Sequence, residues 1–128
     1  MSEKSVIGEG IINFVGKVTN ISRSVIPNVS IIEISGPNIS MKMDLVKDLW
    51  RVKVGDEVEV LITKEKPSFE KGKDFVAHGH IVTKRKESDV YKLLISLWGF
   101  LVILISKDKS LHDTFGYVDK VYVKMRKV

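Results

Sequence analysis

The stretch that decides the fold is residues 93–106, which read LLISLWGFLVILIS without a single charged side chain. A lysine bounds it on each side, so 14 uncharged residues stand together, whereas a membrane-spanning helix needs about 20. Gly99 divides the stretch, and glycine supplies the positive φ that a two-residue hairpin turn requires. We therefore expect two antiparallel strands, residues 90–97 and 100–106, joined by Trp98 and Gly99.

The composition of the whole chain also favours strands. Its 128 residues include 18 Val and 14 Ile, but only 9 Leu and a single Ala. Side chains branched at Cβ lose χ1 freedom in helices and pack well on a pleated sheet. The length suits one domain, and the absence of cysteine excludes disulfides, thiolate zinc sites and cysteine nucleophiles. The lack of Cys and Gln beside abundant Lys and Glu is typical of a thermophile.

Alternation of apolar and polar residues predicts the remaining strands. It is clearest at residues 39–45, where Ile39, Met41, Met43 and Leu45 alternate with Ser, Lys and Asp. Further elements are expected as strands at residues 11–21, 29–35, 57–62, 75–84 and 121–126, and as single helical turns near Asp48 and Leu111.

About eight short strands with little helix predict an all-β fold, a single closed or nearly closed antiparallel barrel. Closure hides the edges that so many Val and Ile residues would make prone to aggregation. Gly16, inside the first strand, is expected to mark a bulge or a bend. We expect one domain at residues 10–128 after a flexible segment at residues 1–9. That segment has no long apolar run and is not a secretory signal, so we expect a cytoplasmic protein.

The sequence contains no motif that carries a recognisable reaction. His78 and His80 share one face of a predicted strand, but zinc needs three or four ligands, so we expect two exposed imidazoles. Glu57 and Glu59 also share a face, and alternation directs both outward, away from the apolar pocket that a general acid requires. We therefore expect no catalytic, cofactor-binding or metal site.

The net charge of +5 is concentrated in two segments. Residues 64–86 and residues 120–128 each carry an excess of four positive charges. Such segments either face nucleic acid or an acidic partner, or form solvated loops that keep the domain soluble. The candidates for weak, non-specific contacts with nucleic acid are Lys64, Lys66, Lys71, Lys73, Lys84, Arg85, Lys86, Lys124, Arg126 and Lys127.

Trp98 stands apart from the other aromatic residues, because the tip of a hairpin is hard to bury in its own barrel. It is either covered by a loop or held for a partner, and large aromatic residues are enriched at interface hot spots.

Three stretches together resemble one family. The first is residues 39–45 (ISMKMDL) followed by the Gly55–Asp56 turn and the strand at Val58, the second is residues 75–82 with Gly79, and the third is the apolar hairpin with the basic last strand. In order and spacing they resemble the small barrel subunit of multisubunit RNA polymerases, which is the G subunit of archaeal enzymes and the common subunit 8 of eukaryotic ones. The resemblance covers nearly the whole chain. Eukaryotic members differ in having a Gly-Gly hairpin turn and a longer excursion near the middle of the chain.

This resemblance implies a barrel of the oligonucleotide/oligosaccharide-binding (OB) type. It also implies a non-catalytic peripheral subunit that docks on the largest polymerase subunit and supports assembly and stability in transcription, with catalysis and its magnesium ions left to the large subunits. We expect Trp98, Gly99 and Phe100 at the partner interface, no cofactor, no membrane and no homo-oligomer. The alternative is a free-standing OB-fold protein that binds RNA or single-stranded DNA.

Overall fold

The computed structural model describes residues 5–47 and 50–128. Strands account for most of the chain, and the one helix in these ranges has four residues, which confirms the expected all-β class. The elements are β1 (Val6–Gly8), β2 (Ile11–Arg23), β3 (Val29–Gly36), β4 (Ile39–Val46), β5 (Glu57–Thr63), β6 (Asp74–Glu87), β7 (Val90–Leu97), β8 (Phe100–Ser106), α1 (Ser110–Asp113) and β9 (Lys120–Lys127).

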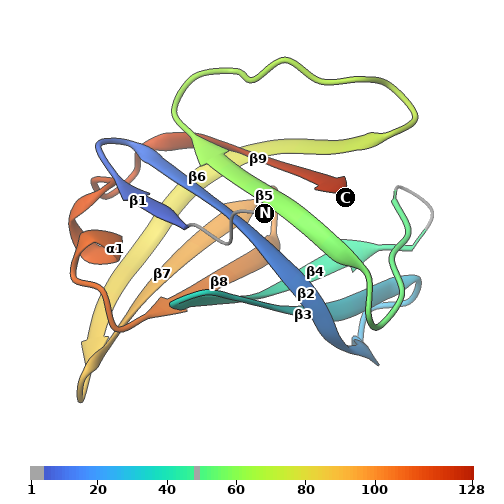
Figure 1. Ribbon diagram of the computed structural model, residues 1–128, viewed down its shortest axis with the longest axis horizontal. Coiled ribbons are helices and arrows are strands. Elements are labelled where there is room, and N and C mark those ends of the chain that lie inside the picture. The colour runs from blue at the N-terminus through green and yellow to red at the C-terminus, as the bar shows by residue number, and fades with distance from the viewer. Residues whose placement is uncertain (1–4, 48–49) are drawn as a thin grey trace.

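The strands form a closed antiparallel barrel (Figure 1). The order β2-β3-β4-β8-β7-β6-β9-β5 returns to its start because β5 also pairs with β2. The short strand β1 lies outside this ring of eight and pairs with the first residues of β2. It falls within the segment expected to be flexible; Ile7 packs against the core and Gly10 N donates to Thr114 Oγ1 at 3.0 Å.

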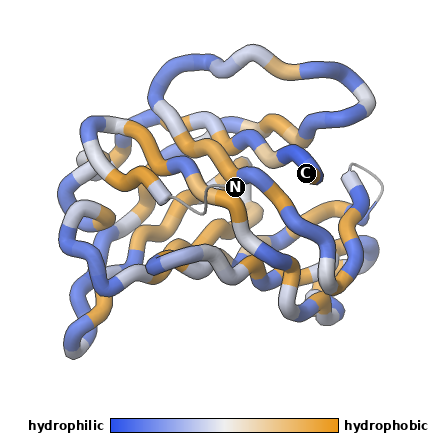
Figure 2. Tube along the Cα trace, viewed as in Figure 1, coloured by the Kyte–Doolittle hydropathy of each residue, from blue (hydrophilic) through white to orange (hydrophobic). Residues whose placement is uncertain are grey.

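The core follows the predicted alternation. In β4 the side chains of Ile39, Met41, Met43 and Leu45 are all buried. Figure 2 shows apolar residues recurring along the strands, whereas the long loop between β5 and β6 is mostly hydrophilic. No helix in the described part of the chain is long and apolar enough to cross a membrane.

Two glycines are required where strands approach closely. A Cβ on Gly16 would lie 2.6 Å from Ile34 Cγ2, and a Cβ on Gly79 would overlap the carbonyl oxygen of Ser96. Gly16 was expected to mark a bulge or a bend, and the bulge lies further along β2, where the pairing with β3 shifts between Val18 and Asn20. Gly16 is therefore explained by packing against β3 rather than by a bulge.

The two ends of the barrel are finished differently. At one end α1 lies across the opening (Figure 1). Its Leu111 and the following Phe115 are buried, and the helical turn expected near Leu111 is confirmed. At the other end the loops β2–β3 and β4–β5 border a cavity. We call this the open end. The helical turn expected at Asp48 lies outside the described residues.

Candidate partner-binding surface

The β7–β8 hairpin has the predicted two-residue turn. Trp98 and Gly99 have φ values of 56° and 96°, consistent with the primed turns that suit hairpins. The Gly99 N–H donates to Ser96 Oγ at 3.2 Å, which fixes the turn locally. A positive φ is unfavourable for a bulky residue such as Trp, so the backbone holds Trp98 in a strained conformation.

The turn presents Trp98 to solvent. Its side chain and backbone together are 77% exposed, and its indole meets the His78 ring edge-on, with ring centroids 5.5 Å apart. His78 in turn lies 5.7 Å from the Tyr122 ring, on the neighbouring strand β9. Trp98, His78 and Tyr122 thus form an aromatic cluster on the outside of the barrel.

Phe100 has a different environment from Trp98. It is paired with Leu97 at the base of the hairpin and packs, partly buried, against the hydrophobic core. Trp98 is therefore exposed at the tip of the hairpin, whereas Phe100 is directed inward, although both were expected from the sequence to lie at the partner interface.

The two histidines on β6 also differ from each other. His80 is exposed as expected, whereas His78 is half-buried and its Nδ1 is buried without a hydrogen-bond partner among the described atoms. The expectation of two exposed imidazoles was therefore wrong for His78, because the indole of Trp98 folds against it. Across residues 5–47 and 50–128, no group of three His, Cys, Asp or Glu side chains could hold a metal ion.

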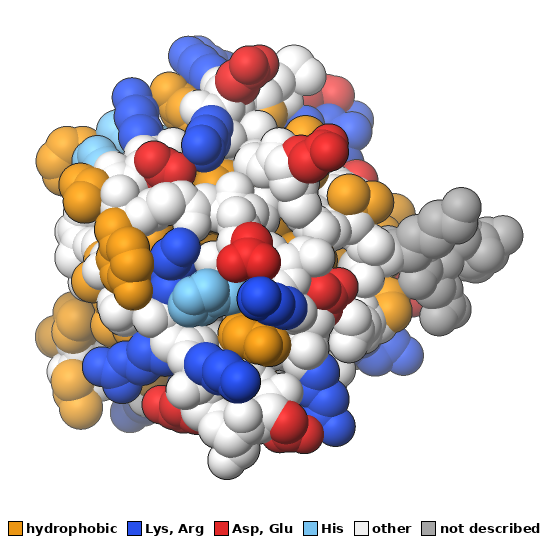
Figure 3. All heavy atoms as spheres, turned by 90° about the vertical axis from the view of Figure 1, so that its left-hand side faces the viewer, with side chains coloured by type: hydrophobic (Ala, Val, Ile, Leu, Met, Phe, Trp, Pro, Cys, Tyr) orange, Lys and Arg blue, Asp and Glu red, His pale blue; other side chains and the backbone are white. Residues whose placement is uncertain are grey.

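The ten candidate cations do not form one stripe. The β5–β6 loop lies beside β9, since Lys124 Nζ donates to the Ser68 carbonyl at 2.6 Å. Lys84, Arg85 and Lys86 lie instead at the far end of β6, and ten strand residues from Asp74 to Lys84 span about 33 Å. In Figure 3, which faces the α1 end, Lys and Arg side chains are interspersed with Asp and Glu.

Most of these cations already have partners. Five are ion-paired with carboxylates of the chain: Lys64 with Asp119, Lys73 with Glu70, Arg85 with Glu87, and Lys124 and Arg126 with Asp74. Two more lie over aromatic rings: Lys84 over Tyr117 and Lys86 over Tyr91. Lys66, Lys71 and Lys127 have no ion pair with any described carboxylate.

Asp74 is the centre of the strongest ion-pair network. Its side chain has no exposed surface, and its two oxygens accept from Arg126 Nε at 2.6 Å and Arg126 Nη2 at 3.0 Å. The hydrogen bond from Arg126 is the main reason that the pKa of Asp74 is lowered, and burial opposes it. The same pair raises the pKa of Arg126. The backbone N–H of Glu70 also donates to Asp74 at 2.8 Å, so this network holds the β5–β6 loop against the barrel.

Sequence reasoning missed Asp74 because its partner is 52 residues away. The pairing can be recognised only when the strand register is known, because Asp74 on β6 and Arg126 on β9 are register partners.

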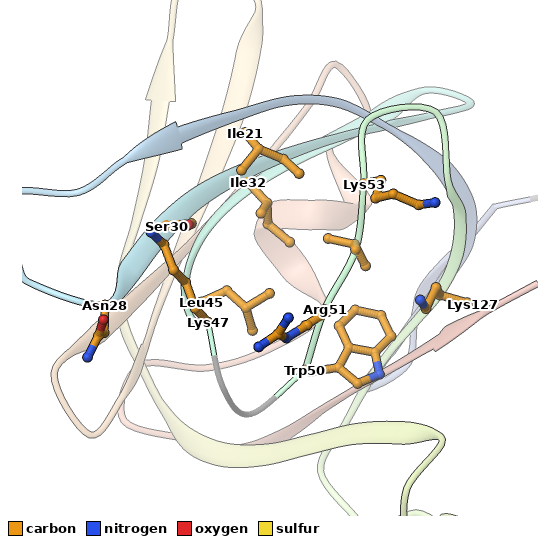
Figure 4. A pocket seen from close by; sticks show the side chains of 11 residues that line it. Ile21, Asn28, Ser30, Ile32, Leu45, Lys47, Trp50, Arg51, Lys53 and Lys127 are labelled. Atoms are coloured by element: carbon orange, nitrogen blue, oxygen red, sulfur yellow. The ribbon is translucent and has the colours of Figure 1, made fainter.

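The open end contains a cavity of about 540 Å³ (Figure 4). Trp50 forms part of its wall, with Nε1 donating to the Lys73 carbonyl at 3.1 Å and its ring 6.1 Å from that of Phe75. The Trp98 turn belongs to the same end, because the N–H of Leu101 donates to Asp44 near the end of β4. The lining residues are Ile21, Asn28, Ser30, Ile32, Leu45, Lys47, Trp50, Arg51, Val52, Lys53 and Lys127.

A family model that describes the G subunit of DNA-directed RNA polymerase matches residues 11–128. The chain belongs to this family of polymerase subunits. The match includes all eight strands of the closed barrel, and the resemblance seen in the sequence is confirmed.

Curated relatives agree with the family. The DNA-directed RNA polymerase subunit Rpo8 of Saccharolobus solfataricus is 30% identical over 118 residues, covering 87% of this chain and 89% of the relative. The protein of the same name from Sulfolobus acidocaldarius is 29% identical over 114 residues, covering 87% and 93%. A solved structure of a cytoplasmic molybdate-binding protein covers 94% of this chain and 92% of its own at 10% identity, but its TM-score of 0.37 supports no argument.

Proposed function

We propose that this chain is a non-catalytic peripheral subunit of an archaeal RNA polymerase in the cytoplasm, docked on the largest subunit and supporting assembly and stability of the enzyme. The observation that carries the docking proposal is Trp98, which a strained turn holds at the tip of a hairpin with most of its surface exposed. A strained residue persists where the surroundings fix it, and such residues cluster at functional sites. Family membership favours this function over that of a free-standing nucleic-acid-binding barrel.

Nucleic acid has a minor part in this proposal. Each phosphate that a protein neutralises contributes to a steep fall of affinity with salt. Seven of the ten candidate cations already pair with carboxylates or aromatic rings of the chain itself. We therefore expect weak binding of single strands with a shallow salt dependence, carried mainly by Lys66, Lys71 and Lys127.

Reconstitution from purified subunits tests the docking proposal. Trp98→Ser should leave the barrel folded but weaken association with the largest subunit by about 2 kcal/mol, the usual scale for a Trp hot spot. Tyr117→Ser serves as the matched control, because Tyr117 is another exposed aromatic residue but lies near the α1 end. Equal affinity of wild type and Trp98→Ser would contradict the assignment of Trp98, and failure of the wild type to associate would contradict the proposed function.

A further inference from the structure

The cavity at the open end combines an apolar wall with a cationic rim. Ile32 and Leu45 are buried in its wall, where Trp50 also packs. Lys47, Lys53 and Lys127 line its edge, and none of the three has an ion pair with a described carboxylate. No lining residue that the structure describes is acidic. The charge of the described rim residues is therefore complementary to an anionic occupant.

The two loops that border the cavity also carry exposed apolar residues. Val25 and Ile26, in the β2–β3 loop, and Val54, just before β5, are exposed. A cavity of this size falls in the range of small-molecule sites, about 300–1,000 Å³. A small ligand inside it would leave these three side chains in water, whereas a polypeptide lying across the open end would cover them.

We infer that the open end of the barrel receives an acidic segment of a large polymerase subunit, which inserts an apolar side chain into the cavity while its carboxylates pair with Lys47, Lys53 and Lys127. The inference rests on the proposed function and names the chemistry of the partner segment. An apolar anchor in a pocket with charged groups around it is the usual arrangement of an interface hot spot, and the charge complementarity steers association.

Two pairs of variants test the rim. Lys53→Glu with Lys127→Glu reverses two rim charges, and Lys107→Glu with Lys109→Glu makes the same change beside α1, at the opposite end. We expect the rim pair to weaken binding to the purified large subunits by about tenfold or more at low salt. The difference should shrink as salt screens the charges. The control pair should bind like the wild type, and thermal unfolding should show that both variants are folded.

A third variant tests the cavity itself without changing charge. Ser30→Leu places a larger apolar side chain in the cavity wall and should also weaken binding, with no change in salt dependence. A photo-crosslinking residue in place of Val52, which lines the cavity, should be joined to a segment of a large subunit that contains both acidic and apolar residues.

The outcomes separate this inference from the proposed function. If the wild type binds the large subunits but the folded rim variant binds equally well, the inference is overturned and the subunit assignment stands. Crosslinks from position 52 that reach only basic or uncharged segments would also overturn it. So would saturable binding of decanoate to the isolated chain together with wild-type affinity of the rim variant, because the cavity would then be a site for a small amphipathic anion. If the wild type does not bind at all, the proposed function fails first.

Discussion

The two ends of the barrel differ in whether side chains fill the opening or leave a cavity. At the α1 end the chain fills the opening with its own side chains, since Leu111 and Phe115 are fully packed there. The shallow hollow that remains between β1 and α1 is lined by two carboxylates, Glu9 and Asp113. At the open end the cavity has lysines on its rim, and the Trp98 turn lies at the same end of the barrel. The same strands run between the two ends, so much of the difference comes from the connecting segments: α1 and the residues after it fill one end, whereas the β2–β3 and β4–β5 loops border a cavity at the other.

The largest expected loss of stability comes from removing a side chain that fills the α1 end. Phe115→Ala removes a large buried side chain and should lower the free energy of unfolding by about 3–5 kcal/mol. Denaturant unfolding measures this loss. Binding to the large subunits, measured where the variant is still folded, should not change, and a loss of binding as large as the loss of stability would show that the α1 end also contacts the partner.

The hairpin turn at the open end should be the next most sensitive position. Gly99→Val forces a β-branched residue into a φ of 96°, although nothing lies within 4 Å of the new Cβ. The cost is therefore backbone strain alone, about 1–3 kcal/mol, visible in thermal unfolding. Unfolding at the wild-type temperature would mean that the turn relaxes into another conformation and does not fix Trp98.

The buried carboxylate near the open end should make stability depend on pH. The pKa of Asp74 is held below its ordinary value of 3.8, chiefly by the hydrogen bond from Arg126. The stability that the ionised carboxylate contributes is therefore complete above that ordinary value and is lost as the pH falls through the lower pKa of the folded state. Asp74→Asn should be less stable than wild type at pH 7, by less than Phe115→Ala because Arg126 is 43% exposed. The difference should narrow at pH values below about 4. A difference that stays constant down to pH 2 would contradict this account.

The smallest change in the free energy of unfolding should come from substitution of Trp98. The direction of that change distinguishes a role in the barrel from a role in binding a partner. Asn-Gly is the preferred pair for the turn that Trp98 and Gly99 now occupy. Trp98→Asn should therefore raise the free energy of unfolding by about 0.5–1 kcal/mol, while association with the large subunits falls. A variant that is destabilised would show that the contact with His78 outweighs the strain, and that Trp98 serves the barrel rather than a partner.

Local patterns predicted the wall of the barrel well. The alternation in β4 and the Trp98–Gly99 turn are properties of neighbouring residues, and both are confirmed. The site was predicted less well, because its parts come together only through the register of distant strands. The pairing of Asp74 with Arg126, the inward direction of Phe100 and the cavity behind Trp50 all depend on which strands are neighbours. Charge counts located the basic segments, but only the structure shows that most of those cations are already paired.

Amide hydrogen exchange of the chain, free and within the reconstituted polymerase, tests the central claim most directly. If the open end is the docking surface, assembly should slow exchange in the β2–β3 loop, at residues 50–56 and at Trp98 and Gly99. Exchange in α1 and in the loop that follows it should be unchanged. Protection confined to the α1 end, with the open-end loops exchanging as fast as in the free chain, would contradict the account.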